Sequence, residues 1–183
     1  GDPYEDHGRF QALWEYQALM GELLERDVVN VPTYDGFQAA GTAIRMAARI
    51  TGRHRALVAA SVSADKRSKV ADYVRPDVEL ELVPFDAASG TLDLAALEAA
   101  LGPDIACVFV ENPTFLGTVE TGGPGIVRLA HAAGALAVVS VDPSTLGVLA
   151  PPSSWGADID CGDIQALGIH MQTGGGHGGF IAS

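Results

Sequence analysis

Asp142 is the first residue that could do chemistry, because it directly follows an apolar, strand-like run over residues 136–141 and precedes Pro143. A carboxylate at the end of a buried strand could face a bound cation, such as the protonated ring nitrogen of a cofactor. The same side chain could instead cap the turn that follows the strand, since Asp-Pro turns are common. The sequence leaves both interpretations of Asp142 open.

A glycine-rich loop over residues 174–179 contains a single histidine, His177. The glycines on both sides leave room around the ring, so we expect an accessible imidazole and take His177 as the candidate catalytic residue. The loop could line an anion or a cofactor with its backbone N–H groups, or it could be a plain tight turn. Its spacing fits neither a Walker loop nor a GxGxxG fingerprint, so it does not indicate a nucleotide site.

Tyr34 and Asp35 precede a predicted helix, at a position where free N–H groups and the helix dipole attract anions. A cofactor phosphate could bind at such a turn. Asp35 could instead cap the helix, and its carboxylate would then satisfy the same donors and repel a phosphate. The capping interpretation implies that the pocket holds no phosphate.

The elements that must position these residues alternate along the chain. Apolar runs predict strands over residues 56–61, 78–83, 105–110 and 136–141. Residues 157–159 lead a further short strand, and a strand-like pattern follows over 178–183. Three-to-four spacing of apolar residues predicts helices over residues 8–26, 37–51, 64–74, 92–101 and 125–133. This alternation predicts an α/β fold with a doubly wound, mostly parallel sheet, in a single domain over residues 1–183.

Composition narrows the possible partners and the compartment. The formal net charge of −12 argues against binding to nucleic acid or to an anionic membrane surface. No apolar run approaches the ~20 residues that span a bilayer. Cys107 and Cys161 lie in apolar runs and predict buried free thiols, which fit a reducing, cytoplasmic compartment. No Cys/His cluster has the spacing of a metal site.

Taken together, these pieces resemble one family, the glycine decarboxylase or P-protein of the glycine cleavage system. The similarity is to its first subunit, in organisms that split the protein in two, and it covers nearly the whole chain in order. It rests on residues 8–17 (GRFQALWEYQ), 34–36 (YDG), 92–97 (LDLAAL), 111–117 (ENPTFLG), 129–135 (LAHAAGA), 139–143 (VSVDP), 156–158 (GAD), 165–169 (QALGI) and 174–177 (GGGH).

The resemblance implies the large domain of a pyridoxal-phosphate enzyme of the aspartate-aminotransferase type. Such an enzyme holds the cofactor aldehyde on a lysine amine. The chain has only two lysines, Lys66 and Lys69, both far upstream in a predicted polar helix, and Gln165 stands where the family's lysine is expected. The resemblance therefore implies that a lysine-bearing partner subunit carries the cofactor. The vestigial pocket in this chain would be lined by Tyr34, Asp35, Asp142 and Gln165.

The function that the resemblance implies is that of a subunit without cofactor, or part of one, in a glycine-decarboxylase-like enzyme. The complex would be an aminomethyl-transferring glycine dehydrogenase, which releases carbon dioxide from glycine and passes the aminomethyl group to a lipoyl carrier protein. We expect this chain to be inactive alone and to form a dimer or hetero-oligomer. Both ends read as cut, so we expect a shortened chain or a fragment of the larger subunit.

Two other functions stay open at this point. The chain could be an inactive scaffold or binding module of the same fold, recruited to another pathway, or an independent pyridoxal-phosphate lyase. An exposed apolar patch on the first helix would favour a partner interface, whereas ordinary core packing would explain the same residues without a partner. The patch would consist of Phe10, Leu13, Trp14 and Leu24.

Overall fold

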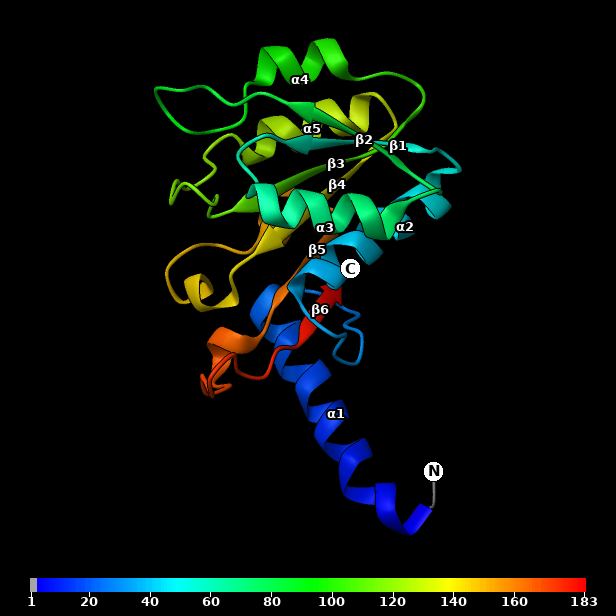
Figure 1. Ribbon diagram of the computed structural model, residues 1–183, viewed down its shortest axis with the longest axis vertical. Coiled ribbons are helices and arrows are strands. Elements are labelled where there is room, and N and C mark those ends of the chain that lie inside the picture. The colour runs from blue at the N-terminus through cyan, green and yellow to red at the C-terminus, as the bar shows by residue number, and fades with distance from the viewer. Residues whose placement is uncertain (1–2) are drawn as a thin grey trace.

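The computed structural model describes residues 3–183, which build a six-stranded sheet in the order β2-β1-β3-β4-β5-β6 (Figure 1). Strands β1 to β5 run parallel, and β6 pairs antiparallel with β5. The mostly parallel α/β sheet that the sequence predicts is therefore confirmed. The strands are β1 (Arg55–Ala59), β2 (Glu79–Val83), β3 (Ile105–Asn112), β4 (Leu136–Val141), β5 (Ile159–Asp163) and β6 (Gly179–Ala182).

Helices cover both faces of this sheet, as a doubly wound fold requires. Helices α2 (Gly36–Thr51) and α3 (Ala64–Val74) lie on one face, and α4 (Leu94–Ala100) and α5 (Gly123–Ala132) lie on the other (Figure 1). Short polar side chains start three of them, with Asp35, Ser63 and Asp93 each accepting a hydrogen bond from a first-turn N–H. Gly52, at φ 68°, ends α2 in the left-handed conformation, as the sequence predicts.

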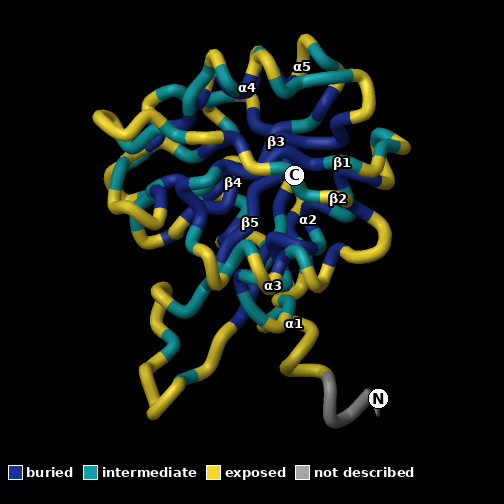
Figure 2. The backbone as a smooth tube through the Cα atoms, turned by 45° about the horizontal axis from the view of Figure 1, so that its top comes forward, coloured by how far each residue is buried: buried dark blue, intermediate teal, exposed yellow. Residues whose placement is uncertain are grey.

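The core lies between the sheet and these helices, where the buried tube in Figure 2 follows the strands. The first six residues of β3 are all buried, as expected of a strand covered on both faces. Cys107 and Cys161 are free and fully buried, which confirms that prediction. Burial raises the pKa of both thiols to about 12.

The β5–β6 hairpin shows where the strand led by residues 157–159 ends. Strand β5 begins at Ile159 and continues to Asp163, because β4 and β6 pair with it on its two sides. The outer edge of β6 is covered by residues 28–33. There the Val28 N–H donates to the Ser183 carbonyl at 3.1 Å and the Thr33 N–H to the Gly179 carbonyl at 2.7 Å. The sheet edge beside the expected site is therefore closed by the chain itself.

Helix α1 (Pro3–Leu24) is anchored at only one end. Met20 and Leu24 are buried against Phe180, whereas Phe10 and Trp14 are 64% and 68% exposed on the half that extends away from the sheet (Figure 1). Leu24 is fully buried, so core packing, one of the two interpretations that the sequence left open, holds for this residue.

An ion pair fixes the chain directly after α1. Arg26 donates to both carboxylate oxygens of Asp160, at 2.7 and 3.1 Å, and to the Ala157 carbonyl at 2.6 Å. Burial raises the pKa of the Asp160 carboxyl, and the Arg26 guanidinium opposes that rise. The anchored end of α1 is thereby fixed to the start of β5.

Between the strands, three short 3-10 turns complete the carboxyl side of the sheet. They are η1 (Pro143–Gly147), η2 (Pro152–Trp155) and η3 (Gln165–Leu167).

Candidate functional site

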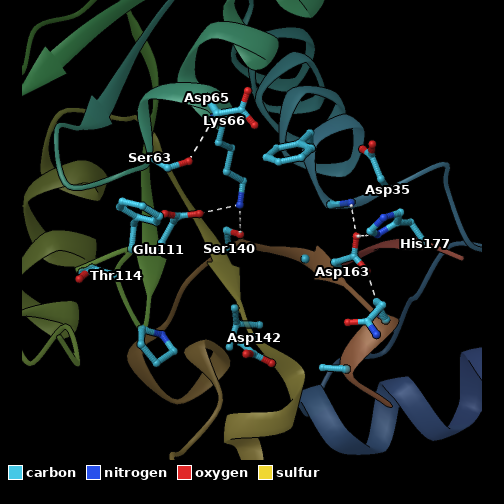
Figure 3. Close-up of a pocket in the computed structure, with 18 of the residues that line it drawn as sticks. Asp35, Ser63, Asp65, Lys66, Glu111, Thr114, Ser140, Asp142, Asp163 and His177 are labelled. Atoms are coloured by element: carbon cyan, nitrogen blue, oxygen red, sulfur yellow. Dashed lines mark hydrogen bonds and ion pairs between the residues drawn. The ribbon is translucent and has the colours of Figure 1, made fainter. Parts of the chain in front are cut away.

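A pocket of about 820 Å³ opens at the carboxyl ends of the parallel strands, which is where ligands bind in this class of fold. The ends of β3, β4 and β5, the first turns of α2 and α3, and the loop after β5 contribute its walls (Figure 3). Four residues singled out from the sequence meet here. They are Asp35, Asp142, Gln165 and His177.

Lys66 is the residue that sequence reasoning missed. Its Nζ atom reaches into the pocket, where it donates to Glu111 Oε1 at 2.6 Å and to Ser140 Oγ at 2.9 Å (Figure 3). The side chains of Lys66 and Glu111 are each only 12% exposed. The interpretation of Lys66 as a residue remote from the site was therefore wrong. A usable signal existed, because a helix that directly follows a parallel strand begins at the carboxyl edge of the sheet.

The geometry around Lys66 does not suit a covalent cofactor link. An amine must be free of its proton to attack an aldehyde. Moving Lys66 out of this cluster would leave the largely buried Glu111 carboxylate without its charged partner, which is costly. We conclude that Lys66 stabilises the pocket wall through an ion pair.

Asp142 closes the β4 end as a turn cap. Its Oδ1 atom accepts from the N–H of Ser144 at 2.9 Å and from the Ser144 hydroxyl at 2.7 Å, and this starts the η1 turn. Of the two interpretations that the sequence left open, the turn cap is thus present. Asp142 also lines the pocket, so its second carboxylate oxygen stays a candidate contact for a ligand.

At the start of α2, two carboxylates meet the helix N-terminus. Asp35 Oδ1 accepts from the Gln38 N–H at 2.7 Å, so the predicted N-cap is confirmed. Asp163, at the end of β5, accepts from the Gly36 N–H at 3.0 Å through Oδ2 and from the Gln165 N–H at 2.8 Å through Oδ1. Asp163 is the last residue of β5, which also contains Asp160 and Gly162, so the apolar pattern that pointed to Asp142 is missing here.

His177 and Gln165 flank this carboxylate pair. The His177 ring is 54% exposed, which agrees with the predicted accessible imidazole, and its Nδ1 atom lies 3.6 Å from Asp163 Oδ2. The Gln165 side chain donates to the Ile169 carbonyl at 2.8 Å and so stabilises its own loop. Tyr34 does not join the site, because its side chain is 82% exposed and does not line the pocket.

The charges in the pocket are mostly negative, since five carboxylates face one lysine and one histidine. A phosphate would meet this surface with unfavourable electrostatics. Because Lys66, the lysine that lines this pocket, is ion-paired, the residues present do not fit pyridoxal phosphate. The carboxylates are those of Asp35, Asp65, Glu111, Asp142 and Asp163.

Residues 3–183 offer neither a metal centre nor a membrane-spanning helix. Within that range, no group of three or more His, Cys, Asp or Glu side chains is arranged to hold a metal ion. None of the helices in the same range has both the length and the apolar character needed to cross a bilayer.

Comparison with known proteins agrees with the geometry. The family model for the glycine cleavage system P-protein matches residues 3–183. The chain is 43% identical, over 99% of its length, to a probable glycine dehydrogenase (decarboxylating) subunit 1 from Geotalea daltonii, and 42% identical to that from Carboxydothermus hydrogenoformans. It spans about 41% of the length of each of these two relatives.

Solved structures support the same fold. A crystal structure of glycine decarboxylase (P-protein) in inhibitor-bound form superposes with a TM-score of 0.88 at 39% identity, covering 96% of this chain and 39% of that one. A cystathionine gamma-lyase from Micromonospora echinospora superposes with a TM-score of 0.70 at 24% identity, covering 93% of this chain and 42% of that one. The second similarity is evidence for the fold alone.

Proposed function

Because the chain belongs to the glycine cleavage system P-protein family, we propose that it acts as the subunit without cofactor, or part of it, in a glycine-decarboxylase-like enzyme. The observation that carries this proposal is the pocket itself. It lies at the carboxyl edge of the sheet, most of its charged side chains are carboxylates, and it is lined by Gln165, which we propose to stand where the family's lysine would be. A partner subunit would supply the lysine and the pyridoxal phosphate.

In the complex, decarboxylation of glycine and aminomethyl transfer to a lipoyl carrier protein would take place at the partner's site. This chain would support the partner's site and contribute a surface to the shared interface. His177, exposed at the mouth of the pocket, is the residue that we propose to face the shared interface. Buried free thiols at Cys107 and Cys161 support a reducing compartment, and we propose a cytoplasmic location.

The free half of α1 supports the existence of a partner. Residues 10, 13, 17, 20 and 24 follow one another at spacings of three and four and so form one stripe along the helix. The stripe is buried at Met20 and Leu24 but exposed at Phe10. A helical segment of about 12 residues is marginal in water without packing. We propose that the partner subunit covers Phe10 and Trp14.

Co-expression with the lysine-bearing subunit tests this function. We expect the native mass of a hetero-oligomer, and we expect glycine-dependent exchange of labelled bicarbonate to rise when both chains are present. The double variant F10E/W14E should weaken the complex at least tenfold. Leu19→Glu is the matched control, because Leu19 is 71% exposed and lies about half a turn from Phe10 around the helix.

A chain that stays alone beside an intact lysine-bearing subunit, and that leaves the exchange rate unchanged, would not be a subunit of this enzyme. The same result would favour the second candidate, an inactive module of this fold recruited to another pathway. The acidic pocket supports this second candidate, because its carboxylates differ from the lining that an anion site needs. The residues in the pocket do not support an independent pyridoxal-phosphate lyase.

A further inference from the structure

We propose that Asp35 and Asp163 fill the anion site at the N-terminus of α2 from within the chain, and that Asp163 thereby holds the loop of residues 164–178 at the mouth of the pocket. The inference concerns this chain alone and does not depend on a partner subunit. It rests on the contacts of two carboxylates that arrive from different parts of the sequence.

The N–H groups in the first turn of α2 are the donors of this anion site. The first N–H groups of an α-helix have no partner inside the helix, and together with the helix dipole they form a ready site for an anion. In α2, two of these donors, the Gly36 and Gln38 N–H groups, already have carboxylate partners, and the Ala39 N–H makes the first bond of the helix itself. The Gly36 N–H donates to Asp163 at 3.0 Å, the Gln38 N–H to the Asp35 carboxylate at 2.7 Å, and the Ala39 N–H to the Asp35 carbonyl at 2.9 Å.

The start of α2 is closely packed by the neighbouring strands. A Cβ atom on Gly36 would lie 2.9 Å from the Asp163 Cβ atom, so the end of β5 packs directly on the helix terminus. On the other side, a Cβ atom on Gly179 would lie 2.2 Å from the Asp35 carbonyl oxygen. A phosphate could reach these N–H groups only by displacing Asp163, and it would meet the charge of Asp35 there.

Asp163 also connects α2 to the loop of residues 164–178. Asp163 pairs with Gly179 at the end of the β5–β6 hairpin, so residues 164–178 form the connection between the two strands. Asp163 joins the base of this loop to the helix, because its other oxygen accepts from the Gln165 N–H at 2.8 Å. His177 returns at the far end of the loop, 3.6 Å from the same carboxylate (Figure 3). Asp163 is thus a positioning residue for Gln165 and His177.

Binding of pyridoxine 5′-phosphate by the full chain tests the first half of the proposal. This probe has an alcohol in place of the aldehyde, so it cannot react with lysines, and pyridoxine without phosphate measures the contribution of the phosphate. We expect the unmodified chain to bind both compounds equally weakly. The double variant D35N/D163N should prefer the phosphorylated compound by about tenfold, since two like charges are removed while the side-chain size is kept.

Asp142→Asn is the matched control, because it removes a carboxylate from the same pocket without touching α2. Like the unmodified chain, this variant should bind the two compounds equally weakly. A clear phosphate preference in the unmodified chain would overturn the proposal, and so would equal binding of the two compounds by a folded D35N/D163N variant.

Amide hydrogen exchange tests the second half and remains informative if the double variant folds poorly. Asp163→Asn should speed exchange at Gly36 and Gln165 and across the loop of residues 164–178. Asp35→Asn should act at Gln38 and leave the loop protected. Unchanged exchange at Gln165 in Asp163→Asn would show that Asp163 does not hold the loop.

Discussion

The two walls of the pocket satisfy their charges in different ways. On the wall that we call the lysine wall (Lys66, Glu111 and Ser140), an ion pair joins the first turn of α3 to the end of β3, and each of its two side chains is 12% exposed. On the aspartate wall (Asp35, Gly36, Asp163 and His177), carboxylates bind helix N–H groups, and Asp163 and His177 are 32% and 54% exposed. The lysine wall is therefore part of the core, whereas the aspartate wall arranges a loop at the surface.

This difference affects the free energy of unfolding, because a polar interaction contributes more to stability when water cannot replace either partner. Removing one partner on the lysine wall leaves a charge with little access to solvent. Removing one partner on the aspartate wall leaves groups that water can reach. The four expectations below follow this order, from the largest loss of stability to the smallest.

Lys66→Met should cost about 2–4 kcal/mol of unfolding free energy, since it leaves Glu111 as an uncompensated, mostly buried charge. Lys69→Met is the matched control, because Lys69 and its partner Asp65 are 52% and 67% exposed. Exposed pairs of this kind contribute about 0–1 kcal/mol. Denaturant titration of both variants measures the difference, and equal losses would mean that the lysine wall is not part of the core.

Gly36→Ala should cost about 1–3 kcal/mol, because the new methyl group would overlap with Asp163 and force the helix and strand apart. Gly8→Ala is the control within a helix. It meets no atom within 4 Å and should stabilise by about 0.5–1 kcal/mol through helix propensity. Thermal melts compare the two. A neutral Gly36→Ala would indicate that α2 and β5 can separate freely at this point.

Asp35→Ala should cost about 1 kcal/mol, as loss of an N-cap does. Asp93→Ala, at the start of α4, removes a cap that accepts from two N–H groups and should cost a similar amount. Chemical denaturation gives both values. A loss for Asp35→Ala several times larger than for Asp93→Ala would mean that Asp35 does more than cap its helix.

His177→Ala should change stability by less than about 0.5 kcal/mol, since its ring is exposed and its contact with Asp163 is long. Its effect belongs to the complex, where we expect the exchange of labelled bicarbonate to fall although the partner chains still assemble. Native mass and exchange rate, measured together, separate these outcomes. Loss of assembly in His177→Ala would mean that His177 holds the two chains together rather than acting on the reaction across their interface.

Local signals predicted most of the fold. The strand at Leu136–Val141 and the helix at Ala64–Val74 have the predicted bounds, because apolar periodicity and capping residues act over a few positions. The sequence did not indicate an end for β5, because pairing with β6 continues this strand over Gly162 and Asp163, which carry no strand signal of their own.

The candidate site was predictable only in part, for the same reason. The Asp35 cap and the exposed His177 could be anticipated from their neighbours in sequence. The start of α3 directly after β1 could have placed Lys66 at this edge of the sheet, but its pairing with Glu111 could not be anticipated. The two residues are 45 positions apart and meet because β1, which precedes α3, lies beside β3.

The sequence alone determined the parallel α/β sheet and the absence of a lysine at Gln165, because apolar patterning and residue identity are local properties. Only the tertiary structure decided which charges share the pocket. It turned Lys66 inward, brought Asp163 onto the first turn of α2 and left Tyr34 in solvent. Such convergence depends on strand order and helix packing, which join residues more than a hundred positions apart.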